Sequence, residues 1–172
     1  MIDEKWIRNA DLALCSLRQM LSIEPFRVEP RWVSESIVTH LSIVLNDVLQ
    51  LFRIVDLRID FIVEGDVKDV TDIVSLYRNA SCNFGSTSRQ MNAGVTVSFM
   101  TMIGKGVGIQ TPDGALENPF EDDVAYFYGN IRLFHKRHIV RAVTIAQEKL
   151  VEIAANFGME DRLMIRLPVG PF

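Results

Sequence analysis

The chain has 172 residues and a formal net charge of −4, with 22 acidic side chains against 18 lysines and arginines. This length favours one domain spanning residues 1–172, with a core that folds without metals or disulfides. The acidic balance disfavours a protein that binds nucleic acid over its whole surface.

Two cysteines are too few for a disulfide scaffold or a zinc site, so we expect free thiols and neither a metal nor a cofactor. The first residues lack the basic and apolar pattern of a signal peptide. No uninterrupted apolar run approaches the ~18 residues that span a bilayer. The sequence therefore predicts a cytoplasmic protein without a membrane segment.

Apolar side chains at alternating steps of three and four residues predict helices along most of the chain. The first helix begins at Asp3, a predicted N-cap, and ends before a connector bounded by Pro25 and Pro30. Its apolar stripe consists of Ile7, Ala10, Leu14, Leu17 and Leu21.

The second predicted helix is the longest. Its apolar stripe is wide, which suits a helix packed between two neighbours. Ser34, Glu35 and Ser42 are expected to lie largely off its apolar stripe, which consists of Ile37, Leu41, Val44, Val48, Phe52 and Val55 and is widened by Val38, Leu45 and Leu49. A third helix is predicted from about Asp69 and ends by Gly85. Its expected buried residues are Val70, Ile73, Val74 and Tyr77.

The apolar period changes to two after a polar loop over 85–94, which predicts a strand over 95–103. The glycine-rich segment 104–108 lacks the spacing of a phosphate-binding loop and is expected to form a hairpin loop. The segment 111–123 is expected to be a surface excursion. Gly129-Asn130 predicts a tight turn between two short strands.

The last predicted helix carries a continuous apolar seam, and Gly158 ends it. The seam consists of Ile139, Val143, Ala146, Leu150, Ile153 and Phe157, and the tail beyond it is expected to be irregular. The predicted fold is mainly α: a bundle of about four helices with a small antiparallel β-hairpin insertion at about 95–134.

The end of the third helix carries the residues most suggestive of function: Arg78, Asn79 and Asn83. Arg78 followed by the polar residue Asn79 resembles the motif of the HEPN superfamily, in which a histidine follows the arginine after four to six intervening residues. Members of this superfamily are small helical bundles, often dimeric, in toxin–antitoxin and phage-defence systems. Catalytic members are metal-independent ribonucleases, and their motif ends in a histidine. The resemblance implies a dimer and a site at the Arg78 stretch.

The resemblance departs at the catalytic residue, because positions 83–85 hold Asn83, Phe84 and Gly85. RNA cleavage by a 2′-hydroxyl needs proton transfer, which an asparagine amide cannot supply near neutral pH. The expected function is therefore a HEPN-like, homodimeric binding or regulatory protein without ribonuclease activity. Two alternatives are a ribonuclease that uses another proton-transfer residue and an unrelated helical interaction module.

A second candidate site is the most basic stretch of the chain. It could bind RNA phosphates, or it could be a solvated helix start, and it consists of Arg132, His135, Lys136, Arg137, His138 and Arg141. His135 and His138 could bind a metal, but no third ligand is evident nearby. For Arg78 the structural alternative is a salt bridge or a helix C-terminal cap.

Overall fold

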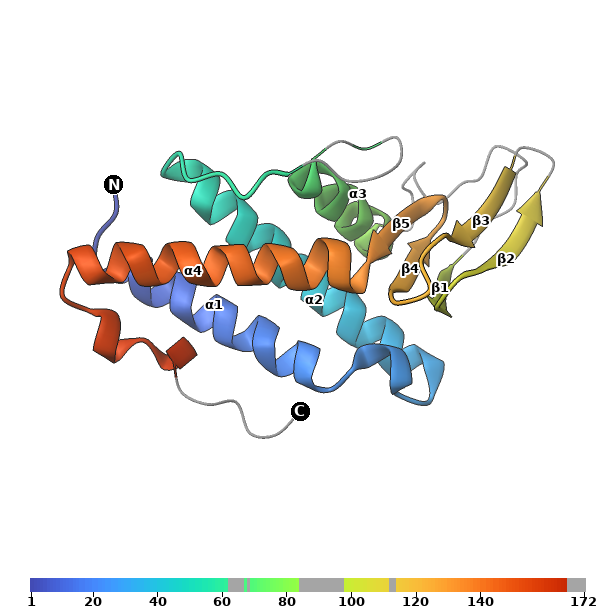
Figure 1. Ribbon diagram of the computed structural model, residues 1–172, viewed down its shortest axis with the longest axis horizontal. Helices are drawn as coiled ribbons and strands as arrows, with labels where there is room; N and C mark the ends of the chain where they lie inside the picture. Colours follow the sequence, from blue (N-terminus) through green and yellow to red (C-terminus); the bar gives the residue numbers. More distant parts are fainter. Residues whose placement is uncertain (62–66, 68, 84–97, 112–113, 167–172) are drawn as a thin grey trace.

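The computed structural model describes residues 1–61, 67, 69–83, 98–111 and 114–166 (Figure 1). Most of these residues are helical, which confirms the prediction of a mainly α fold. The predicted loop over 85–94 and the start of the predicted strand at 95–97 lie outside the described residues. The long helices are α1 (Glu4–Ser22), α2 (Arg31–Ile54), α3 (Val70–Cys82) and α4 (Arg141–Asn156).

Two of the helices begin at aspartates, as the sequence predicts. The Trp6 backbone N–H donates to the Asp3 carboxylate at 2.8 Å at the start of α1. The Thr71 N–H donates to Asp69 at 2.7 Å at the start of α3. These carboxylates satisfy backbone donors that a helix leaves unpaired in its first turn.

Helix α2 packs between α1 and α3, and its buried stripe differs in part from the predicted one. Ile37 and Val44 are only half-buried, whereas Ser42 is fully buried and Ser34 is 5% exposed. The Ser42 hydroxyl donates to the Thr39 carbonyl at 2.7 Å, which satisfies it inside the core. The prediction that both serines lie off the stripe is therefore wrong.

By length and composition α2 could also cross a membrane, with a mean hydropathy of 1.4 over its most apolar window. A core helix of a bundle has the same composition. The position of α2 between α1 and α3 accounts for its apolar composition.

The strands form two small antiparallel sheets rather than one hairpin. β1 (Phe99–Ile103), β4 (Val124–Tyr128) and β5 (Ile131–Phe134) pair in the order β1-β4-β5. Tyr128 pairs with Ile131, which confirms the turn predicted at Gly129-Asn130.

β2 (Gly106–Thr111) and β3 (Gly114–Asn118) form the second sheet. The predictions of a loop at 104–108 and a surface excursion at 111–123 are thus wrong in part. The sequence did not predict β2 because its glycines have low strand propensity, and it did not predict β3 because this short strand shows little alternation of apolar and polar residues.

The three-stranded sheet lies between the helices and the β2–β3 hairpin, at one end of the helical layer (Figure 1). Its helix-side face contributes Phe99, Tyr126, Tyr128 and Leu133 to the main core. Its other face places Ala125, Phe127 and Phe134 against Leu116 of the hairpin. Alternate residues of each strand thus fill two separate apolar clusters.

A single π-helix, η3 (His135–Val140), joins the sheet to α4. The end of the predicted seam is wrong at Phe157, which is 47% exposed, but Gly158 has a φ of 61° and ends the helix as predicted. The short helices η4 (Glu160–Arg162) and η5 (Met164–Arg166) follow, so this part of the tail is more regular than predicted, and its remainder, 167–172, lies outside the described residues.

The buried Asp11 carboxylate on α1 holds η5 in place. It accepts the backbone N–H groups of Met164 at 2.8 Å and Ile165 at 3.0 Å. The C-terminal turn is therefore fixed to the first helix.

Candidate functional site

The first candidate site lies on the surface at the end of α3. Arg78, Asn79 and Asn83 are all exposed, while Tyr77 and Ala80 of the same turn are buried. The Arg78 guanidinium donates to the Asn79 side-chain oxygen at 3.2 Å. The Asn83 backbone N–H closes the helix by donating to the Asn79 carbonyl at 3.1 Å.

This geometry leaves the Arg78 guanidinium directed at its neighbour and at solvent. Among the described residues no carboxylate forms a salt bridge with Arg78. Asn83 has left the helical conformation, with φ −119° and ψ 105°, so Asn79 and Asn83 do not continue one helical face. These three side chains can donate hydrogen bonds to an acceptor on a partner, but none of them can gain or lose a proton near pH 7.

The second candidate site is organised around a carboxylate that precedes it in the chain. Asp123, whose side chain is fully buried, accepts the backbone N–H groups of Lys136 at 2.8 Å and Arg137 at 3.1 Å. These N–H groups belong to the first turn of η3, where a carboxylate is favourable. Asp123 therefore anchors the basic stretch to the sheet.

The arginines of this stretch have partners within the protein. The Arg137 guanidinium lies 3.1 Å from both Asp122 and Asp123, and it covers the Phe120 ring at 3.6 Å. Lys136 lies 3.9 Å from Asp122. The positive charge of these two residues is therefore largely balanced in place.

The other two arginines lie over aromatic rings. Arg132 is 4.9 Å from the Phe134 ring and donates to the Glu117 carbonyl at 2.8 Å. Arg141 is 4.1 Å from the Phe61 ring. Such stacking fixes a guanidinium against the protein surface and reduces its freedom to follow a flexible phosphate backbone.

The two histidines of the stretch are built into the fold. His138 is 2% exposed, its Nδ1 lies 3.2 Å from the Phe134 N–H that donates to it, and burial lowers its pKa to about 4. His135 lies 3.2 Å from the Tyr126 hydroxyl, and burial lowers the pKa of His135 as well. Both rings are thus neutral at pH 7, and no described interaction joins either to Arg78.

The described residues do not support a metal site at His135 and His138. Within the described part of the chain, no three side chains of histidine, cysteine, aspartate or glutamate gather closely enough to hold a metal ion. Cys15 and Cys82 are unpaired.

A third polar group, which the sequence pattern did not reveal, lies between α2, α3 and the sheet. The Tyr128 hydroxyl donates to Glu35 at 2.7 Å, and the Tyr77 ring meets the Tyr128 ring edge-on at 6.0 Å. The Tyr77 hydroxyl is buried without a hydrogen-bond partner among the described residues, and burial raises the pKa of Tyr77 strongly. Only the tertiary contact of Glu35 with β4 could have shown this group.

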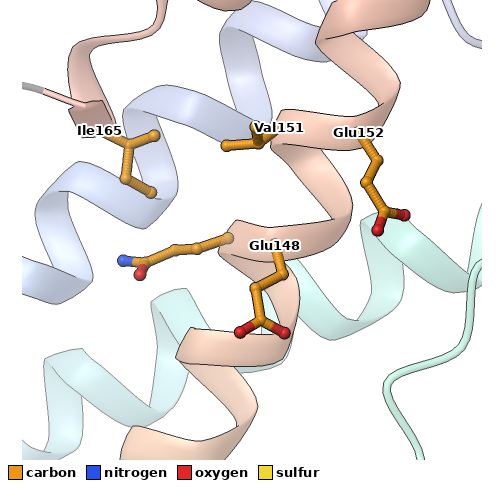
Figure 2. Close-up of a pocket in the computed structure, with 5 residues that line it drawn as sticks. Glu148, Val151, Glu152 and Ile165 are labelled. Atoms are coloured by element: carbon orange, nitrogen blue, oxygen red, sulfur yellow. The ribbon is translucent and has the colours of Figure 1, made fainter.

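The surface carries hollows, two of which lie among the described residues. One, of about 420 Å³, lies between α4 and η5, and Figure 2 shows Val151 pointing toward Ile165 across it. The carboxylates of Glu148 and Glu152 point to different sides in Figure 2 and do not converge on a common position. This hollow therefore lacks the converging polar groups that an active site needs.

The second hollow, of about 250 Å³, lies between the start of α2 and strand β1. Ser34 and Thr101 face it from the two sides. The Thr101 hydroxyl has no hydrogen-bond partner within the described residues, and the charged residues that line the hollow are Glu29 and Arg31.

Comparison with known proteins finds no relative. The chain matches no family model, no curated protein and no solved structure.

Proposed function

We propose that the protein is a HEPN-like binding or regulatory module of the cytoplasm that lacks ribonuclease chemistry. Its contact site is the exposed end of α3. The observation that supports this proposal is the exposure of Arg78, Asn79 and Asn83 together, with the Arg78 guanidinium donating to the Asn79 side chain. Three hydrogen-bonding side chains at a helix end suit recognition of an acceptor-rich partner.

We expect no RNA cleavage because the reaction needs proton transfer. Cleavage of RNA needs a base for the 2′-hydroxyl and an acid for the leaving oxygen. Asn83 supplies neither. His135 and His138 lie in η3, directly after β5. His135 is hydrogen-bonded to Tyr126, and His138 accepts from the Phe134 N–H, so both are held inside the packed structure.

RNA binding is expected to be weak and sensitive to salt. The net charge is −4, and Asp122 and Asp123 balance Arg137 and Lys136. Arg78 then supplies little more than one phosphate contact per chain. Because such a contact is electrostatic, added salt weakens the binding further.

The test is a cleavage assay with chelator present, which compares wild type, Asn83→His and Arg78→Ala on labelled single-stranded RNA. We expect no cleavage by wild type or Arg78→Ala. Arg8→Ala is the control, because Arg8 is also an exposed helical arginine with a 63% exposed side chain.

Robust wild-type cleavage that disappears in Arg78→Ala, but not in Arg8→Ala, would overturn the non-catalytic proposal. It would favour the ribonuclease alternative. Weak RNA binding that Arg78→Ala abolishes supports the contact site, and equal loss in Arg8→Ala would point to general charge instead.

A further inference from the structure

The face of α2 that points away from the core carries large apolar side chains in an ordered row. Trp32 at its start is 67% exposed and Ile54 at its end is 76% exposed. Ile43 lies midway between them, eleven residues from each, and is half-buried. Helix α2 crosses behind α4 in Figure 1, and its buried residues, which include Val38, Leu45 and Leu49, lie on the opposite side of the helix from this row.

Polar side chains occupy the positions between the three apolar ones. Ser36, His40, Asp47 and Gln50 are all exposed on the same face, at steps of three and four residues. From Ile43 toward either end of the helix, the row runs apolar, polar, polar, apolar. The pattern is therefore nearly symmetric about Ile43.

A row with this symmetry is complementary to itself when a second copy is turned around. In an antiparallel pair with Ile43 at the two-fold axis, Trp32 lies opposite Ile54 of the other copy. Ser36 lies opposite Gln50, and His40 lies beside Asp47. A two-fold axis repeats each contact, as a symmetric dimer requires.

The charge pattern also excludes the parallel arrangement. Parallel α2 helices would place Asp47 directly opposite Asp47, and like charges at an interface are unfavourable. The antiparallel arrangement brings Asp47 to an imidazole instead. It also buries the two most exposed apolar side chains of α2 at both ends of the contact.

We propose that the outer face of α2, defined by Trp32, Ser36, His40, Ile43, Asp47, Gln50 and Ile54, is an antiparallel homodimer interface. The row runs from Trp32 to Ile54, which is about 33 Å of helix. A contact through one helix per chain is smaller than the ~1,600 Å² of a standard interface, so the dissociation constant is expected to be about micromolar. The interface is separate from Arg78 and stands whether or not that site binds a partner.

The experiment is sedimentation velocity on the full chain from about 1 to 500 µM, a range chosen around the expected affinity. Wild type is expected to pass from monomer to dimer. Ile43→Arg puts two cations at the axis and is expected to weaken the dimer at least about a hundredfold. Trp32→Glu changes a side chain too exposed to affect folding and is expected to weaken it at least about tenfold.

A matched control is Leu12→Glu on α1, because Leu12 is 53% exposed and lies off the α2 row. It should leave the association unchanged. Circular dichroism of each variant checks that the helices remain folded. Association that is lost equally in Leu12→Glu, or retained in both α2 variants, would overturn the interface.

Charge reversal tests the orientation. Asp47→Lys is expected to weaken the dimer about threefold to tenfold, and the double variant His40→Glu, Asp47→Lys is expected to restore it, because the antiparallel pair then brings the introduced carboxylate to the introduced ammonium group. No restoration would contradict the antiparallel pairing. A wild-type protein that stays monomeric at 500 µM would overturn the dimer, and flotation with anionic vesicles in that case would assign the face to a lipid surface.

Discussion

The two polar stretches that the sequence singles out differ in what surrounds them. At the end of α3, Arg78 has an asparagine neighbour and solvent. In the stretch from Arg132 to Arg141, the cationic side chains meet carboxylates, a backbone carbonyl or aromatic rings of the protein. The basic stretch therefore serves mainly to hold the sheet and α4 together, whereas the α3 end is exposed.

The difference teaches that a run of basic residues cannot be interpreted without its tertiary neighbours. Asp122 and Asp123 precede Lys136 and Arg137 by about a dozen residues, yet the β4–β5 hairpin brings them into contact. The positive charge that suggests phosphate binding in the sequence is thus already balanced in the fold.

The largest effect is expected from removing the carboxylate at the centre of the basic stretch. Asp123→Ala leaves the first N–H groups of η3 and the Arg137 guanidinium without their buried partner. We expect a loss of about 3–5 kcal/mol in the free energy of unfolding, measured by urea denaturation. Asp122→Ala is the control, since its side chain is 62% exposed and its midpoint should barely change. Equal effects of the two substitutions would refute the anchoring role of Asp123.

A pH dependence of stability is the next largest effect. His138 has a pKa of about 4 in the folded protein, whereas the unfolded chain takes up the proton near pH 6.5. Between these values the unfolded state binds more protons, so stability falls as the pH is lowered from about 6.5 to about 4. The loss is expected to reach up to about 3 kcal/mol.

His138→Gln should remove the part of this dependence that comes from His138, whereas the part from His135, whose pKa burial also lowers, should remain. Urea unfolding at pH 7.5, 6 and 5 measures it. A His138→Gln protein whose stability still falls as steeply as wild type would contradict the buried, neutral imidazole.

The smallest effect separates the two arginine environments directly. Arg137→Ala removes the stacking on Phe120 and the pairing with Asp123, and is expected to cost about 1–2 kcal/mol. Arg78→Ala is expected to change stability by less than about 0.5 kcal/mol, as at an ordinary surface position. Thermal or urea unfolding of both variants measures these losses of stability. A larger loss for Arg78→Ala than for Arg137→Ala would mean that the role of Arg78 is structural.

The helices were predictable because their signals are local. The aspartates at positions 3 and 69 and the apolar steps of three and four residues fix where α1 and α3 begin and which sides they bury. The Gly129-Asn130 turn is local in the same sense. Arg78, Asn79 and Asn83 were also correctly placed at the end of a helix.

The failures come from packing, hydrogen bonding and strand pairing that the apolar period of a segment does not record. Ser42 lies in the core because its hydroxyl finds the Thr39 carbonyl, and β2 forms although glycines weaken its strand propensity, because β3 pairs with it. The contact of Tyr128 with Glu35 joins residues far apart in the chain. A single sequence contains no signal for such pairs.

All three tyrosines of the chain belong to that junction between α2, α3 and the sheet, and each is at most 4% exposed. Trp6, by contrast, packs against Phe52 where α1 meets α2. Tyrosine absorbance therefore reports on one place in the molecule. Burial raises the pKa of Tyr77 and of Tyr126, so phenolate absorption from these two rings should appear on alkaline titration only when that junction opens. The protein thus carries a built-in optical probe for the docking of its sheet.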